Sequence, residues 1–281
     1  MRFENTTVMN FEGALRGMRN PLNSWAKSDS QFGIYCEYED SISEDVYNVA
    51  NAWAEYELQN AAFATEEEYS EEFDKISDAK YTWLWQQGAA LIGNHHYRLD
   101  LIGPADMDLC RRLINGGSEH RKFLRQIMVS VDITAPLYWF KEFDTYRIGV
   151  TENSTSTMHK LASTPITLEC FETDDYDDSI TYCYPDVEGS TLDMPVGAFA
   201  EDLIADLEAL RQKYNETKDK RYWKELVRWL PNGWLQTRTV TMNYENLRSM
   251  AHQRMGHKLS EWHTFLEWAN TLPYAKELIF D

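Results

Sequence analysis

A cluster of hydroxyl and amide side chains after Gly149 has the residue types that hydrogen-bond a polar ligand. These residues suit a loop better than a helix interior, because their side chains compete for backbone hydrogen bonds. Arg147 stands just before the cluster and His159 just after it. The cluster comprises Thr151, Asn153, Ser154, Thr155, Ser156 and Thr157. The pattern predicts a loop that binds a polar small molecule.

The elements before this loop would form the wall and floor of such a site. Between residues 123 and 133, apolar and more polar side chains alternate, which is the period of a half-buried strand. The apolar positions are Ile127, Val129, Val131 and Ile133. Pro136 then suits the first turn of a helix, and aromatic residues follow at roughly helical spacing as far as Tyr146.

Two further arginines lie on predicted helices. Arg19 lies on a short helix predicted between Asn10 and Pro21. Arg254 lies eleven residues after Asn243, which follows a predicted strand and should cap the next helix. The alternatives stay open: Arg19 could be a solvated residue of an ordinary amphipathic helix, and Arg254 could form a surface salt bridge.

The spacing of the histidines and cysteines does not indicate a metal site. His95 and His96 are adjacent, so their side chains point in different directions on a helix or strand. The histidines near the C-terminus are spaced five and six residues apart, which does not place them on one helical face. The four cysteines lack C-x-x-C spacing, so we expect reduced thiols in a cytoplasmic protein.

Composition limits the classes of partner. The chain has 281 residues, 43% of them hydrophobic, and can therefore bury a large core. Its net charge of −19 argues against a nucleic-acid partner, because no basic stripe is present to release counterions. A small anion held by two or three arginines remains compatible with that charge. No apolar run approaches the ~20 residues of a membrane helix, so no membrane partner is expected.

The chain shows no internal repeat, low-complexity tract or flexible linker, which favours a single domain over residues 1–281. Residues 41–94 are helical in pattern and contain an acidic run at 66–74, interpreted as a solvated helix face. The other predicted elements are a helix over 105–115, strands over 166–171 and 180–184, helices over 196–214 and 221–230, and a strand over 237–243 followed by a helix over 244–254.

The order of the central pieces resembles that of the flavin-dependent thymidylate synthases. In that family a strand ending in Ala-Pro and an aromatic helix precede the signature R-H-R-x-x-S-x-x-x-x-S-x-R. Aligned without gaps from Ala135-Pro136 to Lys160-Leu161, the signature falls on Thr145, Tyr146, Arg147, Val150, Thr155 and Thr157. Only Arg147 is kept outright, and Thr155 replaces one serine with another hydroxyl residue. A histidine that the family places near its flavin corresponds to Gln126.

The C-terminal third is similar to the family in the order of its residues. The corresponding positions are Leu230-Pro231, Thr237-Arg238, Asn243, Leu247, Arg254 and Trp262. The resemblance covers residues 9–21, 113–161 and 228–265. It implies an α+β fold, with a mixed sheet flanked by long helices, an acidic helical insertion around 41–94 and a variable insertion around 162–227. It also implies a homotetramer whose pockets are shared between subunits.

The departures from the signature bear on ligands. In the family the basic triplet binds the flavin, and the last arginine helps to bind the phosphate of deoxyuridylate. Each lost cation removes a charge-assisted hydrogen bond of ~1.5–3 kcal/mol, so we expect no resident cofactor, with FAD possible only if the chain is catalytic. What remains could stack a base and hydrogen-bond a ribose. The predicted nucleotide-binding residues are Arg147, Arg254, Thr155, Asn153, Tyr146, Asn243, Trp139, His159 and Arg19.

These observations lead to three hypotheses about function. The first is a nucleotide-binding protein with altered or lost catalysis, for example a phage or mobile-element protein that sequesters or modifies a nucleotide. The second is an active flavin-dependent methyltransferase acting on a pyrimidine nucleotide, with its missing cations supplied from elsewhere in the chain. The third is an interaction protein that kept only the packing of the fold. A flavin absorbance band in purified protein would favour the second.

Overall fold

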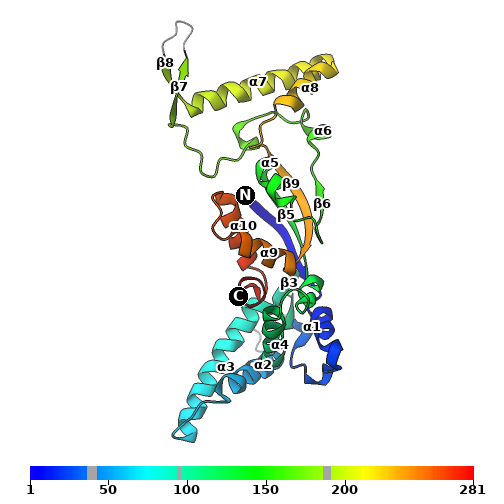
Figure 1. Ribbon diagram of the computed structural model, residues 1–281, viewed down its shortest axis with the longest axis vertical. Coiled ribbons are helices and arrows are strands. Elements are labelled where there is room, and N and C mark those ends of the chain that lie inside the picture. The colour runs from blue at the N-terminus through cyan, green and yellow to red at the C-terminus, as the bar shows by residue number, and fades with distance from the viewer. Residues whose placement is uncertain (37–42, 94–95, 186–190) are drawn as a thin grey trace. The chain divides into compact units, whose positions relative to one another are not determined.

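The computed structural model describes residues 1–36, 43–93, 96–185 and 191–281 (Figure 1). The strands are β1 (Arg2–Met9), β2 (Gln31–Cys36), β3 (Ala89–Gly93), β4 (His96–Leu101), β5 (Met128–Pro136), β6 (Thr151–Ser154), β7 (Thr181–Pro185), β8 (Thr191–Pro195) and β9 (Leu235–Asn243). The main helices are α1 (Phe11–Arg19), α2 (Glu44–Leu58), α3 (Glu66–Gly88), α4 (Pro104–Asn115), α5 (Leu137–Phe143), α6 (Thr157–Lys160), α7 (Val196–Thr217), α8 (Lys220–Trp229), α9 (Tyr244–Arg254) and α10 (Ser260–Asn270). Short 3-10 turns and a π-helix at Lys276–Phe280 complete the described elements.

Helices and sheets alternate along the chain, which confirms the α+β class. A four-stranded sheet has the order β1-β5-β9-β6. A second, antiparallel sheet has the order β2-β4-β3, and β7 pairs with β8 in an antiparallel hairpin. The predicted strand at 180–184 and the predicted strand at 237–243 are thereby confirmed, with shifts of a residue or two at their ends.

Strand β5 follows the predicted alternation but starts later than expected. Val129, Val131 and Ile133 are buried, and the residues between them are partly exposed. Residues 122–126 instead form a 3-10 helix, so the prediction of a strand from residue 123 was wrong. The adjacent side chains of Phe123 and Leu124 are both buried, whereas neighbours in a strand point to opposite faces.

The aromatic helix after β5 is also shorter than its pattern indicated. Pro136 is the residue before the first helical position, and the helix ends at Phe143. Tyr146 lies in the following turn, where its backbone N–H donates to the carbonyl of Phe143 at 2.9 Å. The helical spacing of Tyr146 was therefore coincidental, because a turn brings it back toward Phe143.

The chain divides into two compact units. Unit 1 comprises Met1–Thr6, Val131–Arg147 and Thr151–Val240, and unit 2 comprises Thr7–Ser130, Ile148–Val150 and Thr241–Asp281. Strands β1, β5 and β9 contribute residues to both units. The single domain over 1–281 stays a prediction for this reason, as do the insertions around 41–94 and 162–227.

Unit 1 contains a small core beneath α7 and α8. Leu161, Ile166, Leu207 and Leu226 are its buried members. The predicted strand over 166–171 was wrong, because Leu168–Cys170 forms a 3-10 turn and Phe171 pairs with Trp234 in an isolated bridge rather than in a strand. Ile166 is buried in this core from an irregular segment that precedes the turn, which explains its apolar character.

Unit 2 is centred on a cluster of aromatic rings. Phe11 meets the rings of Tyr244 and Tyr274 edge-on, with centroids 5.7 Å apart in each case. The Tyr244 hydroxyl donates to the carbonyl of Pro273 at 2.7 Å, and the Tyr274 hydroxyl donates to that of Asp100 at 2.9 Å. Burial raises the pKa of both phenols, so they remain neutral donors.

In the part of the chain that the structure describes, no helix is long and apolar enough to cross a membrane. No group of histidine, cysteine, aspartate and glutamate side chains among these residues could hold a metal ion. His95, which the sequence analysis considered as a ligand beside His96, lies outside the described residues.

Candidate functional site

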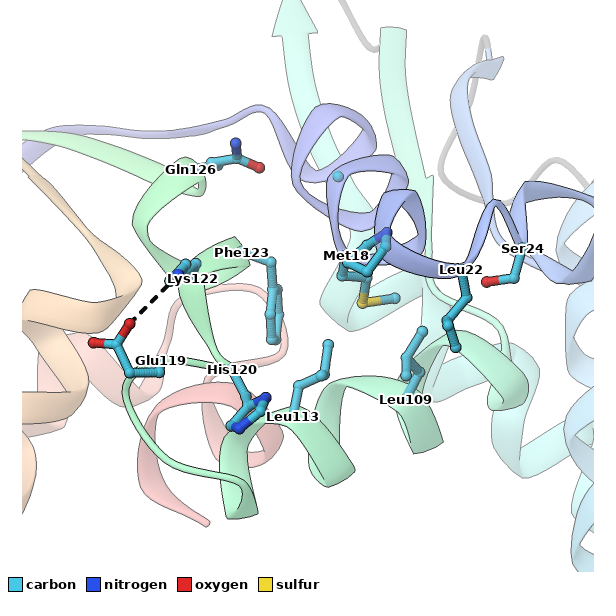
Figure 2. Close-up of a pocket in the computed structure, with 12 residues that line it drawn as sticks. Met18, Leu22, Ser24, Leu109, Leu113, Glu119, His120, Lys122, Phe123 and Gln126 are labelled. Carbon is cyan, nitrogen blue, oxygen red and sulfur yellow. Dashed lines mark ion pairs between the residues drawn. The ribbon is translucent and has the colours of Figure 1, made fainter.

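A pocket of ≈ 360 Å³ opens in unit 2, where α1, α4 and the 3-10 helix at residues 122–126 meet (Figure 2). Its lining comes from segments that are distant in sequence. The lining residues are Gly17, Met18, Pro21, Leu22, Ser24, Leu109, Leu113, Glu119, His120, Lys122, Phe123 and Gln126. None of these residues is among the nucleotide-binding residues predicted from the sequence.

The floor of the pocket is apolar. Met18 and Phe123 are buried, and they lie with Leu109 and Leu113 in the same hollow (Figure 2). Leu22 stands at the edge with 85% of its surface exposed. The apolar surface of Leu22 is thus left in water beside an apolar hollow. This arrangement favours binding of an apolar or flat group, which would cover both.

Two polar residues of the pocket approach glycines closely. A Cβ atom added at Gly17 would lie 2.8 Å from Oε1 of Gln126. One added at Gly116 would lie 3.2 Å from the ring and Cβ of His120. The Gln126 backbone is held as well, since Asn10 Nδ2 donates to its carbonyl at 3.0 Å. The glycines therefore let an amide and an imidazole sit against the helices that line the pocket.

The charged residues of the pocket form an exposed pair. Lys122 Nζ lies 3.4 Å from Glu119 Oε2, and the two side chains are 63% and 79% exposed. An ion pair in water contributes little stability, so the ammonium group can exchange this carboxylate for another anion. The pocket thus offers an amide, an imidazole and an accessible cation around an apolar floor.

A buried ion pair supports the helices behind the pocket. Arg19 Nε donates to Asp106 Oδ1 at 2.5 Å, and both side chains are buried. The hydroxyls of Ser28 and Ser30 donate to Asp106 Oδ2 at 2.5 and 2.6 Å. The expectation of a solvated Arg19 was therefore wrong: its guanidinium joins α1 to α4. Its proposed contact with a nucleotide would have to compete with this carboxylate.

The thiol of Cys110 is buried next to the pocket residue Met18. Cys110 Sγ lies 3.6 Å from Met18 Sδ in the core of unit 2. Burial, with the nearby Asp106 carboxylate adding to it, raises the pKa of the Cys110 thiol well above its ordinary value. The protonated thiol is unreactive at neutral pH.

Several of the residues predicted from the sequence lie on the surface of unit 1. Arg147 is exposed, and its Nε donates to the carbonyl of Asp144 at 2.8 Å. Asn153 on β6 and His159 on α6 are exposed as well. Thr155 is tied to β9, since its N–H donates to the Thr237 carbonyl at 2.9 Å and its hydroxyl accepts from the Thr237 N–H at 3.3 Å.

Trp139 lies in the core of unit 1. It is fully buried and stacks on Phe143 at a centroid distance of 5.0 Å, with Phe140 edge-on at 5.2 Å. Tyr146 is half-buried nearby in the sequence. Stacking of a base on Trp139 would therefore require these rings to move, whereas Tyr146 keeps part of its surface accessible.

In unit 2, two of the predicted residues have evident structural contacts. Asn243 is buried and caps α9: its Oδ1 accepts from the N–H of Asn246 at 3.0 Å, and Asn246 Oδ1 accepts from the N–H of Asn243 at 3.2 Å. The guanidinium of Arg254 lies 4.8 Å from the ring centroid of Trp262, a cation–π geometry. The predicted cap is confirmed. Ligand roles for both residues stay predictions.

Arg238 in unit 1 was named from the sequence only as part of the resemblance, and no role was predicted for it. Its Nη1 donates to Asp144 at 2.7 Å and to Glu152 at 2.9 Å, and its guanidinium lies 3.9 Å from the centroid of the Phe140 ring. Two carboxylates neutralise this cation, so we interpret it as a structural link rather than an anion site. No periodic signal marks such a cluster, because its members come from three separate segments.

No family model matches the sequence, and no curated protein is significantly similar to it. The chain is similar in backbone to solved structures of flavin-dependent thymidylate synthase ThyX from Helicobacter pylori complexed with FAD and dUMP. One has 14% identity and a TM-score of 0.45, the other 12% and 0.47, and each match covers 90% of this chain and 97% of the other.

A third similar structure is the UMP/dUMP methylase PolB from Streptomyces cacaoi bound with 5-Br UMP. It shows 15% identity, a TM-score of 0.44, and coverage of 62% of this chain and 82% of the other. Similarities of this strength assign no family, ligand or activity to the chain.

Proposed function

We propose that this chain binds a nucleotide, with the base in the pocket of unit 2. The observation that carries the proposal is an apolar hollow between α1, α4 and the 3-10 helix with an amide, an imidazole and a cation at its edge. A nucleobase has two apolar faces and a polar edge, and its phosphate is anionic. The hollow offers a group for each of these features.

The polar edge of a base matches the carboxamide of Gln126. A carboxamide both donates and accepts hydrogen bonds, as do the edges of all nucleobases. Phe123 and Met18 would cover one face of the ring, and Leu22 is exposed enough to cover the other. Lys122 would pair with the phosphate in place of Glu119.

We further propose that catalysis of the thymidylate synthase type is altered or lost. The sequence places Thr145, Tyr146 and Gln126 where the resembling family has two basic residues and a histidine near its flavin. A pocket that keeps a neutral amide in place of a cationic group holds an anionic cofactor less tightly. Stoichiometric FAD in purified protein would overturn this part of the proposal and favour the methyltransferase.

The residues predicted from the sequence remain proposed nucleotide contacts of a separate site, because none of them lines the pocket of unit 2; they include Arg147, Arg254, Thr155, Asn153, Tyr146 and His159. A homotetramer, a cytoplasmic location and a phage or mobile-element setting are likewise carried forward as proposals. Binding in the pocket of unit 2 depends on none of these proposals, so evidence against any of them would not count against binding in the pocket.

The test is calorimetric titration of the chain with dUMP, UMP and AMP. We expect binding of at least one of them and a roughly tenfold to hundredfold loss of affinity in Lys122→Ala, because one charge-assisted contact disappears. Lys75→Ala is a matched control, since Lys75 forms a similar exposed pair with Glu72 at 3.1 Å on α3. Arg147→Ala and Arg254→Ala are assayed in the same way for their proposed contacts.

A second variant separates binding from folding. Gly17→Ala would push the Gln126 amide out of place while adding a better helix former to α1. We therefore expect weaker nucleotide binding with an unchanged or higher melting temperature. Gly256→Ala, whose new methyl group would meet no atom within 4 Å, is the control. Absence of binding of all three nucleotides, or parent-like affinity in both pocket variants, would contradict the proposal.

A further inference from the structure

Helix α7 in unit 1 leaves part of its apolar surface uncovered. It has 22 residues, all of them described, and Leu207 is the only one that is buried. Phe199 on α7 is 54% exposed, and Trp229 at the end of the neighbouring α8 is 64% exposed. A long helix whose apolar residues remain open to water costs free energy unless another surface covers them.

A groove lies beside this surface, and the leucines of α7 that line it are buried in the core of unit 1 or half-buried against it. The groove, of ≈ 670 Å³, runs between α7 and α8, which lie side by side (Figure 1). It is lined by Leu203, Asp206, Leu207, Ala209, Leu210, Lys213, Tyr222 and Trp229. The α7 members recur at intervals of three and four residues, so they follow one face of the helix.

The charges along this face are arranged with opposite signs at its two ends. Asp206 and Lys213 line the groove on either side of Ala209 and Leu210, and both are exposed. Seven residues correspond to about two helical turns, or about 10 Å along the axis. Lys213 also pairs with Glu216 at 3.5 Å, but this exposed contact is weak enough to exchange.

We propose that α7 packs antiparallel against α7 of a second copy of this chain. With the twofold axis between Ala209 and Leu210, Asp206 of each copy lies opposite the second copy's Lys213. The same patch then meets itself, as an isologous interface requires. Ala209 at the centre allows the helices to approach closely, and Trp229 and Tyr222 of α8 close the sides of the apolar contact.

The charges favour a second copy of the chain over an unrelated protein. A single face that carries both an acid and a base, equally distant from its centre, is complementary to itself only when the helices run antiparallel. In a parallel pair, like charges would face each other and repel. Apart from Trp229, the residues of the proposed contact lie outside those that resemble the thymidylate synthases, and the proposal does not rest on nucleotide binding.

The experiment is sedimentation analysis of the full chain across a micromolar concentration series. In Asp206→Lys, positions 206 and 213 of each copy both carry a positive side chain. In Lys213→Glu, both carry a negative side chain. We expect each variant alone to associate roughly tenfold or more weakly than the parent, because two pairs change from attraction to repulsion. An equimolar mixture of the two variants should associate again, since each base then meets an acid.

The double variant Asp206→Lys with Lys213→Glu should also restore association, because both charges are exchanged together. Glu201→Lys, an exposed change on the opposite side of α7, is the control and should associate like the parent. Circular dichroism melting checks that each variant is folded. A monomeric parent, association that survives both single variants, or a mixture no stronger than its components would overturn the proposal.

Discussion

At the scale of single residues, the buried pair of Arg19 and Asp106 should matter most for stability. Asp106 is fully buried and accepts from the guanidinium of Arg19 and from two serine hydroxyls. In Arg19→Ala the Asp106 carboxylate would lose the positive charge that pairs with it, although it remains buried away from water. We expect a loss of about 3–5 kcal/mol in the free energy of unfolding, measured by urea denaturation.

Arg16 provides the control for that prediction. It lies on the same helix, α1, but it is exposed, so Arg16→Ala should change the free energy of unfolding by about 0.5 kcal/mol or less. If Arg19→Ala were equally mild, the guanidinium would be dispensable to the fold, and the sequence-based view of Arg19 as a ligand residue would regain support.

Glu208 on α7 should make the stability of unit 1 depend on pH. The Arg211 guanidinium donates to both carboxylate oxygens, at 2.6 and 2.7 Å, and the Ile166 N–H donates to one of them at 2.8 Å. These contacts, with the Arg211 hydrogen bonds as the main cause, lower the pKa of Glu208 from 4.5 to about 2. The folded state therefore prefers the ionised carboxylate.

Because the pKa of Glu208 is lower in the folded protein than in the unfolded chain, the ionised carboxylate stabilises the folded protein at pH values above its unfolded-state pKa. This stabilisation is lost as the pH falls through the folded-state pKa. Glu208→Gln should thus cost about 1–2 kcal/mol at neutral pH, a figure reduced for the partial exposure of the pair. The difference between parent and variant should shrink as pH falls from 4.5 toward 2. Denaturation curves across this range provide the measurement, and a pH-independent difference would show that the charge is not the cause.

At the scale of elements, the capping box of α9 illustrates how a short motif fixes the start of a helix. Asn243 and Asn246 each accept a hydrogen bond from the other's backbone N–H. The Asn246 side chain also donates to the carbonyl of Ile148 at 2.7 Å, which holds the preceding loop segment of unit 2. The two asparagines thus position both the helix and the loop beside it.

Asn243→Ala should lower the free energy of unfolding by about 1–2 kcal/mol, because a backbone N–H at the helix start loses its acceptor. Asn243→Asp keeps an acceptor at the same place and should retain most of the stability. Thermal melting of the two variants makes the comparison. Equal losses in both would mean that the amide group, rather than its oxygen, is required at this position.

At the scale of the whole molecule, net charge restricts what the chain can bind. The net charge of −19 creates a repulsive field for any long polyanion. A small anion differs, because local cations such as Lys122 act on it at short range while distant charges are screened. The acidic composition and the proposed nucleotide site are therefore compatible.

We expect the chain not to bind DNA or RNA at about 0.15 M salt. Fluorescence anisotropy of labelled single-stranded and duplex oligonucleotides, titrated with the chain to high micromolar concentration, measures this. Single mononucleotides in the same buffer serve as the comparison. Tight, salt-sensitive oligonucleotide binding would reveal a basic surface that the sequence analysis did not recognise.

Local pattern was enough to predict several elements of this protein. The alternation in β5, the long amphipathic runs of α7 and α8, and the asparagine before α9 each record how neighbouring residues meet water or the backbone. These signals are carried by residues close in sequence, so they can be read without knowing the fold. They also sufficed for the α+β class.

Only the tertiary structure decided which distant residues meet. Arg19 and Asp106 are 87 positions apart, and no periodicity tells a buried, paired arginine from a solvated one. Trp139 reads equally well as a stacking platform or a core ring until Phe140 and Phe143 enclose it. The pocket of unit 2 exists because α1, α4 and the 3-10 helix converge on it. Whether a side chain is buried, and which side chain it pairs with, depends on contacts between residues far apart in the sequence. The local order of side chains does not determine those contacts.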